Sequence, residues 1–204
     1  MALNLEKQLR FYGAYHDNPV NIGVHLIGVP IILWTTFLMF TNSGTLIPLP
    51  QPMSVPHLEL NAGTLFCLSY CGLYILLEPV AGTAYAVLLL ASTAYGHYLV
   101  EIYGMTANYW AAAGFVGSWV AQIGSHKVFE GRAPALLDNL FQAFFLAPLF
   151  VWLEILFALG YRPELKNRVD EMVQQDIAKY RKAKGQITNG NVNGSAENGH
   201  AKQS

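Results

Sequence analysis

The chain has 204 residues, of which 53% are hydrophobic and only 12% are Asp, Glu, Lys or Arg, with a net charge of −1. A soluble domain usually carries about 25% charged residues, yet Lys127 and Arg132 are the only basic residues between Phe11 and Tyr161. This composition excludes an ordinary water-soluble domain, a nucleic-acid-binding protein and a disordered protein, and it indicates an integral membrane protein.

The chain starts with a segment typical of a helix that lies on a membrane surface. Residues 3–15 alternate apolar and polar side chains with helical spacing. Asn18 and Pro19 then mark the start of a second helix, because an Asn side chain caps the first turn and proline needs no hydrogen-bond partner there.

Five apolar runs follow, and each is long enough to be considered as a membrane-spanning helix. Only helices or closed barrels satisfy the backbone in lipid, and the alternating pattern of a barrel is absent. The sequence therefore predicts an all-α, polytopic membrane helical bundle of four to five apolar helices. The runs are 22–41, 60–77, 80–100, 102–123 and 136–159.

The distribution of basic residues bears on the topology. If all five runs crossed the membrane, the basic segment after Arg162 would lie opposite Lys7 and Lys127, although basic residues favour the cytosolic side. We therefore expect the run 136–159, bent at Pro148, to re-enter or to lie along the surface. Four spans and two cytosolic termini would result.

The chain divides into three predicted parts. Residues 1–162 form one membrane-embedded helical domain. Residues 163–184 have the pattern of an exposed amphipathic helix, and residues 185–204 are rich in Asn and Gly and are expected to be disordered.

Histidines beside the apolar runs are candidates for chemistry, because ionisable groups are costly in lipid. His16 and His25 lie at the start of the first run and His126 at the end of the fourth, so a bundle brings all three to one membrane face. His97 lies near the far end of the third run, and we keep it as a further candidate metal ligand. The alternative is that each histidine is only a buried side chain bonded to a carbonyl.

Polar residues one helical turn away could orient these imidazoles. Asn21 precedes His25 by four residues, Gln122 precedes His126 by four, and Glu130 follows it by four. Metal-bound histidines usually donate their second ring N–H to such groups, and Glu130 could itself be a ligand. Imidazoles with a carboxylate suit Fe(II), Zn(II) or Mn(II), and the spacing does not choose among them. The motifs HExxH, GxSxG and GxGxxG are absent.

Two segments resemble a known family. YGAYHDNPVNIGVHLIGVP (12–30) and QIGSHKVFEGRAPALLDN (122–139) are similar to the motifs of the fungal 2-hydroxy fatty acid dioxygenase family. The chain departs from these motifs at Ser125, which separates Gly124 from His126, and at Asp17, where a second histidine can follow the first.

The resemblance implies an endoplasmic-reticulum, multi-pass membrane enzyme that uses Fe(2+) and O₂. It would remove one carbon from a long-chain 2-hydroxy fatty acid in α-oxidation, downstream of phytosphingosine degradation. His16, His25 and His126 match the motif histidines of the family. The matching polar companions are Asn18, Asn21, Glu130, Pro134, Asp138 and Asn139.

Conversion of R–CH(OH)–COOH and O₂ to R–COOH, CO₂ and H₂O balances without a co-reductant, so no nucleotide-binding motif is needed. The acyl tail would lie among apolar helices or in the bilayer. Lys127 or Arg132 would pair with the substrate carboxylate, although both also fit the role of membrane-surface anchors.

Two alternatives stay open at this point. A helical bundle with two axial histidines would fit a b-type haem protein. A non-catalytic membrane scaffold or transporter would use the histidines only to satisfy helix ends.

Overall fold

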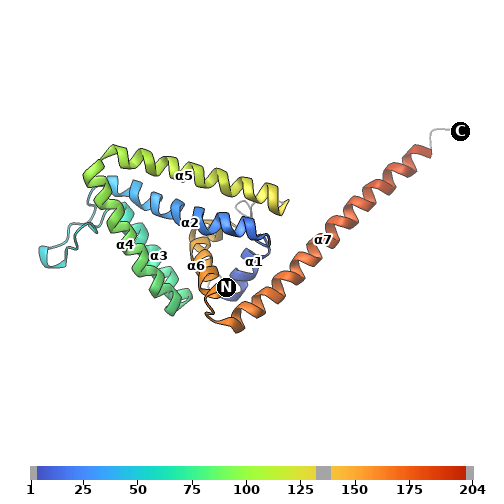
Figure 1. Ribbon diagram of the computed structural model, residues 1–204, viewed down its shortest axis with the longest axis horizontal. Helices are drawn as coiled ribbons and strands as arrows, with labels where there is room; N and C mark the ends of the chain where they lie inside the picture. Colours follow the sequence, from blue (N-terminus) through green and yellow to red (C-terminus); the bar gives the residue numbers. More distant parts are fainter. Residues whose placement is uncertain (1–3, 132–138, 201–204) are drawn as a thin grey trace.

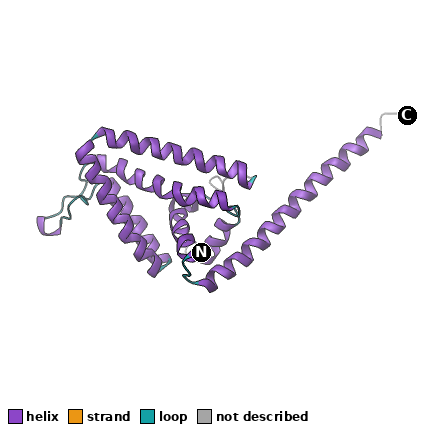
Figure 2. Cartoon of the chain, in the orientation of Figure 1, coloured by secondary structure: helices purple, strands orange, loops and turns teal. Residues whose placement is uncertain are grey.

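The structure, a computed structural model, describes residues 4–131 and 139–200, with only the backbone of Lys184 and of residues 186–200. The described part contains helices and loops but no β-strand, as predicted, and Ile47 and Leu60 form an isolated bridge (Figure 2). The α-helices are α1 (Leu5–Gly13), α2 (Pro19–Phe40), α3 (Ala62–Leu77), α4 (Pro79–Tyr103), α5 (Met105–Ser125), α6 (Ala147–Ala158) and α7 (Pro163–His200). Two π-helical turns, η3 (His126–Glu130) and η5 (Gln142–Leu146), follow α5 and precede α6, and the short 3₁₀ turns η1 (Thr41–Ser43) and η2 (Gln51–Met53) follow α2.

The helices form two antiparallel pairs that meet at one end of the molecule (Figure 1). α2 and α5 lie side by side, and α3 and α4 form a hairpin that slants away from the end of α2. α1 and α6 lie beneath the other half of α2. This arrangement brings the start of α2, the end of α5 and the end of α1 to the same side of the bundle.

Capping side chains fix where the helices start. Asn18 Oδ1 accepts a hydrogen bond from the Val20 backbone N–H, and Pro19 occupies the first turn of α2, as the sequence predicts. Asn4 and Asn61 cap α1 and α3 in the same way. The first residues of α2 are therefore held in one position relative to His16.

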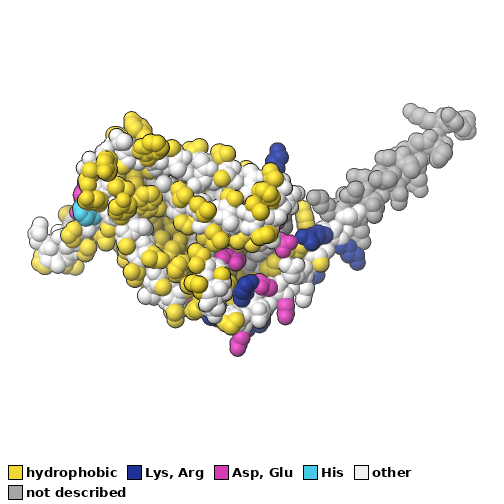
Figure 3. Space-filling model, viewed as in Figure 1, with side chains coloured by type: hydrophobic (Ala, Val, Ile, Leu, Met, Phe, Trp, Pro, Cys, Tyr) yellow, Lys and Arg dark blue, Asp and Glu magenta, His cyan; other side chains and the backbone are white. Residues whose placement is uncertain are grey.

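Apolar side chains cover much of the outer surface, as expected of a protein in a membrane. Leu76, Trp110 and Val120 are 75%, 76% and 66% exposed. On the face drawn in Figure 3, hydrophobic side chains extend over the helical bundle, whereas most charged side chains gather near α1 and α7. This surface favours lipid as its surroundings.

Two described helices are long and apolar enough to cross a membrane, at Pro19–Ser43 and Pro79–Tyr103. The helices Gln142–Ala158 and Pro163–Ala183 count as a third candidate only if they form one broken span, because they are bent by 116°. α3 has 16 residues, about 24 Å, which is less than the ~30 Å of the hydrocarbon core. The apolar runs are helical where they are described, but fewer of them than expected meet the requirements of a span.

The bend in the last apolar run does not lie where proline suggested. Pro148 occupies the first turn of α6, where a missing N–H costs no helical hydrogen bond. The chain turns instead between Leu159 and Arg162, where Gly160 has a φ of 87°. The predicted re-entry of this segment stays a prediction.

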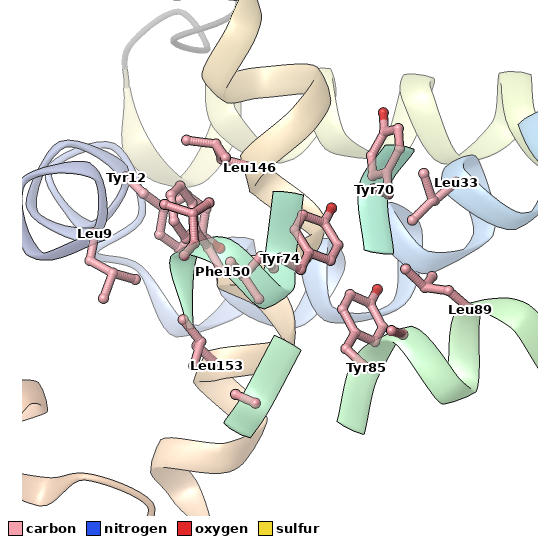
Figure 4. Packing of buried hydrophobic residues seen from close by; sticks show 14 of the residues in the cluster. Leu9, Tyr12, Leu33, Tyr70, Tyr74, Tyr85, Leu89, Leu146, Phe150 and Leu153 are labelled. Carbon is pink, nitrogen blue, oxygen red and sulfur yellow. The ribbon is translucent and has the colours of Figure 1, made fainter. Parts of the chain in front are cut away.

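Aromatic side chains fill the interior between α3, α4 and α6 (Figure 4). Tyr74 stacks on Tyr85 at 5.6 Å between ring centroids, and Tyr85 stacks on Trp152 at 5.3 Å. The α3–α4 hairpin is tight enough that a Cβ at Gly82 would collide with the Tyr74 backbone. Glu78, buried at this turn, accepts a hydrogen bond from the Tyr161 hydroxyl and forms an ion pair with Arg162.

One face of α7 packs against the bundle, which differs from the exposed helix predicted for 163–184. Its buried side chains recur every four residues and include Leu165, Val169, Val173 and Ile177. Arg10 on α1 donates two hydrogen bonds of 2.6 Å to the Asp176 carboxylate, which fastens α7 to α1. The three-part division at residues 162 and 184, with disorder in 185–204, stays a prediction.

The Arg10–Asp176 pair should make the α1–α7 contact depend on pH. The hydrogen bond from Arg10 lowers the pKa of Asp176 below its ordinary value of 3.8. A lowered carboxyl pKa stabilises the folded state above pH ~4 and loses that contribution as the pH falls through the folded-state pKa. Solvent screens the pair, so we expect its contribution to the stability of the folded state to be small.

The measurement is thermal unfolding in detergent between pH 6 and pH 3, for the unmodified protein and for Asp176→Asn. The variant should unfold a few degrees lower at pH 6, and this difference should vanish near pH 3. Glu171→Gln, an exposed carboxylate on the same helix, serves as the control. Equal pH profiles for all three proteins would contradict the assignment.

Candidate metal centre

Three histidines from different parts of the chain meet where α1, α2 and α5 converge. His16 follows α1, His25 lies in the second turn of α2, and His126 is the first residue of η3. Their ring centroids are 4.6 to 4.8 Å apart, and the rings stand at 71° to 81° to one another. One potential ligand atom of each lies within 4.8 Å of the others. We call this group the histidine triad.

Backbone carbonyls set which ring nitrogen faces the centre of the triad. His16 Nδ1 lies 2.8 Å from the Tyr12 carbonyl oxygen, and His25 Nδ1 lies 2.9 Å from the Asn21 carbonyl oxygen. A carbonyl accepts only, so Nδ1 carries the proton in both rings and Nε2 keeps its lone pair. This is the arrangement that metal-bound histidines usually have.

Tyr12 supports the triad from the side of α1. Its ring stacks on His16 with centroids 4.1 Å apart, and it packs against Phe150 of α6 at 5.2 Å. The side chain is buried, and burial raises the pKa of Tyr12, so the phenol stays neutral. His16 is thereby held against the bundle although it lies outside a helix.

Glu130 holds the start of α2 against the end of η3. Its Oε1 accepts hydrogen bonds from the backbone N–H groups of Asp17 and Asn18 and from the Asn21 side chain, at 2.9 to 3.0 Å. The first N–H groups of a helix lack partners within the helix and attract negative charge. The contacts described for Glu130 therefore place its carboxylate at the helix start beside the triad.

A buried polar layer joins α2 to α5 next to the triad. Ser125 Oγ donates to Asn21 Oδ1 at 2.6 Å and to the Gln122 backbone carbonyl at 2.8 Å. Asn21, Gln122 and Ser125 are all at most 6% exposed. Of the predicted companions, Asn21 and Gln122 thus lie next to the triad, and Asn18 caps α2.

The other predicted site residues lie elsewhere. His97 is not part of the triad; it belongs to a separate cluster with Glu59 and Glu101 at the opposite end of α5. Lys127 is exposed at the end of α5. Arg132, Pro134 and Asp138 lie outside the described residues.

An apolar cavity of about 410 Å³ extends from the triad. All three histidines line one part of it, and Val29, Leu33 and Phe40 line it further along α2. From His25 to Phe40 the helix rises about 22 Å. Ile123 and Phe144 line the cavity and are also 47% and 46% exposed, so it reaches the apolar surface of the bundle.

Some residues of the site were missed in the sequence. Ser125 entered only as a departure from a motif, although a buried hydroxyl between two helices is a natural link. Gln142 lines the cavity and donates to the Gln8 backbone carbonyl and side chain, which ties η5 to α1. Gln142 follows Asn139 by three residues, a spacing typical of a helix start, and the Asn139 side chain accepts a hydrogen bond from the Gln142 backbone N–H. This spacing was the signal in the sequence that could have identified Gln142.

The donor set fits a divalent transition metal. Three imidazoles, two of them with a fixed tautomer, leave further coordination positions for small oxygen ligands, which suits Fe(II), Zn(II) or Mn(II). The triad and its apolar cavity define the chain as a helical membrane protein with a candidate metal centre that faces a lipid-sized cavity.

Comparison with known proteins gives the family. The model of the Mpo1-like family, described as 2-hydroxy-palmitic acid dioxygenase Mpo1-like, matches residues 2–159. The chain is 36% identical over 169 residues to the 2-hydroxy-palmitic acid dioxygenase MPO1 of Saccharomyces cerevisiae, covering 82% of this chain and 88% of the relative. The chain belongs to the Mpo1-like family and is an oxidoreductase of the dioxygenase class. No solved structure matches it.

The position of Glu130 predicts how metal binding depends on it. Glu130→Gln removes the negative charge that holds the start of α2, so His16 and His25 lose their fixed relation. We expect the metal affinity of the triad to fall by about ten-fold or more, as is typical of residues that orient ligands. Titration of the purified protein with Fe(II) under anaerobic conditions measures this affinity.

Glu171→Gln removes an exposed carboxylate of α7 and provides the matched control. Thermal unfolding of the metal-free proteins separates a positioning role from general destabilisation. An unchanged affinity in Glu130→Gln would contradict the role assigned to this carboxylate.

Proposed function

We propose that this protein is an Fe(II)-dependent dioxygenase that shortens long-chain 2-hydroxy fatty acids by one carbon. The observation that carries the proposal is the histidine triad at one end of an apolar cavity. Family membership supports the reaction class, and the name of the yeast relative supports a 2-hydroxy fatty acid as substrate.

The proposed reaction balances without further reactants. A 2-hydroxy acid R–CH(OH)–COOH and O₂ give R–COOH, CO₂ and H₂O, so the C1–C2 bond breaks and O₂ takes up four electrons. Bound Fe(II) would supply the redox chemistry that allows O₂ to react with a substrate held by its hydroxyl and carboxylate oxygens. His16, His25 and His126 would hold the iron.

The remaining residues of the site would bind and orient the substrate. Gln122 lines the cavity beside His126, and its buried Nε2 has no hydrogen-bond partner among the described groups. An amide N–H there would donate to the substrate carboxylate. Tyr12 and the apolar wall would keep water from the reacting carbons. Lys127 and Arg132 stay proposed contacts of the carboxylate at the surface.

The cavity matches a long acyl chain in both length and polarity. A palmitoyl chain extends about 18 Å from C2, since tetrahedral bonds of ~1.5 Å advance the chain by roughly 1.25 Å each. The cavity follows α2 for about 22 Å between His25 and Phe40. Its openings beside Ile123 and Phe144 would admit a substrate directly from the bilayer.

The geometry of the triad favours a metal ion bound directly by the three imidazoles over a b-type haem. Two axial histidines bind a haem from opposite faces, and the macrocycle needs the space around the iron. Here the third imidazole centroid is within 4.8 Å of both others, so it occupies that space.

We also propose, from the resemblance, the endoplasmic reticulum membrane as the location and a step downstream of phytosphingosine degradation.

Loss of one triad histidine should abolish the reaction. Purified protein in detergent with 2-hydroxypalmitate, O₂ and Fe(II) should form pentadecanoate, and a chelator should stop it. His25→Ala should reduce the rate by about 100-fold or more, because removal of a ligand costs at least as much as removal of a group that orients one.

Ile27→Ala, at a position of α2 that is 68% exposed, should leave the rate unchanged. Product formation that ignores the chelator, or full activity in His25→Ala, would refute the proposal. If no product formed although iron was bound, the scaffold or transporter alternative would be favoured.

Narrowing the cavity should change the preferred chain length. Thr36 lines the cavity about 16 Å along α2 from His25, and its hydroxyl donates to the Ile32 carbonyl within the helix. Thr36→Trp should therefore block the far part of the cavity. We expect the ratio of kcat/KM for 2-hydroxypalmitate over 2-hydroxylaurate to fall by about ten-fold or more.

Ile27→Trp adds the same volume on the exposed side of α2 and should leave this ratio unchanged. The measurement is product formation from both substrates at several concentrations. An unchanged ratio in Thr36→Trp would mean that the acyl chain does not occupy the cavity along α2.

A further inference from the structure

A second group of metal-binding side chains lies at the other end of the bundle. Glu59 and His57 belong to the segment between η2 and α3, and His97 and Glu101 lie one turn apart on α4. α5 starts next to the end of α4 and ends at Ser125, directly before His126, so its 21 residues place this group about 30 Å from the triad. In Figure 3 a histidine and an acidic side chain lie together at this end of the molecule.

The atoms of this group are close together, and each histidine is paired with a carboxylate. His97 Nδ1 is 2.8 Å from Glu59 Oε2, and His57 Nδ1 is 3.0 Å from Glu101 Oε2. His97 Nδ1, His57 Nδ1 and Glu59 Oε2 are buried atoms, although the Glu59 and Glu101 side chains as a whole are 39% and 45% exposed. Ligands of one ion lie about 3 Å apart, so the His97–Glu59 spacing is compatible with a shared ion.

The negative charge of the two carboxylates in this group also favours a bound cation. Glu59 and Glu101 come from different segments of the chain, and their described ion pairs are with histidines alone. The sequence has only two basic residues between Phe11 and Tyr161, and both follow His126 in the chain. Among the residues that the structure describes, neither carboxylate has an ion pair with Lys or Arg, and a divalent cation would balance their charge.

We propose that Glu59, His97 and Glu101 form a second metal site, for a divalent transition metal such as Zn²⁺ or Mn²⁺. One ligand atom of each lies within 4.8 Å of the others. One imidazole with two carboxylates suits these ions better than Ca²⁺ or Cu⁺. His57 contacts Glu101 and acts as a positioning residue for that carboxylate.

This site has a structural role that is independent of the proposed reaction. His57 and Glu59 lie in the loop after α2, which is largely exposed between Gly44 and Pro56. Its contacts with His97 and Glu101 join this loop to the end of α4. A bound ion fixes the loop by linking residues separated by about 40 positions in the chain. The ion has no contact with the cavity or the triad.

Metal stoichiometry tests the proposal directly. The full chain is purified in detergent, stripped with a chelator, incubated with Zn²⁺, desalted and analysed for bound metal. Glu59→Gln/Glu101→Gln should bind one equivalent less than the unmodified protein. The same loss of one equivalent should appear when His25→Ala is also present, so the result does not depend on the triad. Zn²⁺ should raise the unfolding temperature of His25→Ala, but not that of the variant that combines His25→Ala with Glu59→Gln and Glu101→Gln.

Two further variants make the result decisive. Glu171→Gln carries a matched change at an exposed site and should keep full stoichiometry. His57→Asn should keep the site but weaken its affinity for Zn²⁺ by about ten-fold. This variant provides the test if Glu59→Gln/Glu101→Gln does not fold. Equal stoichiometry in the double variant and the unmodified protein, or no Zn²⁺ bound by His25→Ala, would overturn the proposal and leave two His–Glu ion pairs.

Discussion

The site depends on one carboxylate that binds the start of a helix. Glu130 accepts three hydrogen bonds from Asp17, Asn18 and Asn21, and thereby joins the end of α5 to the start of α2. His16 precedes this point, His25 follows it within two turns, and His126 lies four residues before Glu130 itself. The interaction between this negative charge and the N–H groups at the helix start fixes the relative position of the three imidazoles, together with the Tyr12 ring against His16 and the Ser125–Asn21 hydrogen bond.

The scarcity of charge makes every buried polar contact in this bundle specific. Polar groups in an apolar interior are costly unless they are paired. Asn21 is paired with Ser125 and Glu130, and Glu78 is paired with Tyr161 and Arg162. These contacts join helices far apart in the sequence, whereas the apolar contacts between them can be satisfied in several registers. The polar pairs therefore select one arrangement of the helices.

Much of the site was predictable because its signals are local. The Asn18–Pro19 helix start, the four-residue spacing of Asn21 and His25, and the positions of the histidines along the apolar runs all follow from helix geometry. That geometry also predicts that His97 lies at the wrong end for the triad. Of its partners, Glu101 lies one helical turn away on α4, whereas Glu59 comes from an irregular loop, and no periodic pattern predicts where a loop folds back.

Other features depend on contacts between segments. The stripe from Leu165 to Ile177 shows that α7 has an apolar face, but it does not say whether lipid or α1 covers it. The carboxylate contacts of Glu130 were likewise not predictable, because a spacing of four residues from His126 is compatible with ligation and with capping. Proline alone also misplaced the last bend, since Pro148 starts a helix here and Gly160 turns the chain.

X-ray absorption at the iron edge tests the central claim, that the three histidines hold the iron. The protein would carry Glu101→Gln, to confine the ion to the triad, and one equivalent of Fe(II). We expect imidazole scattering from the three histidines of the triad, reduced by one in a further His126→Ala variant. Scattering without imidazole, a porphyrin signature, or a spectrum that His126→Ala leaves unchanged would contradict the claim.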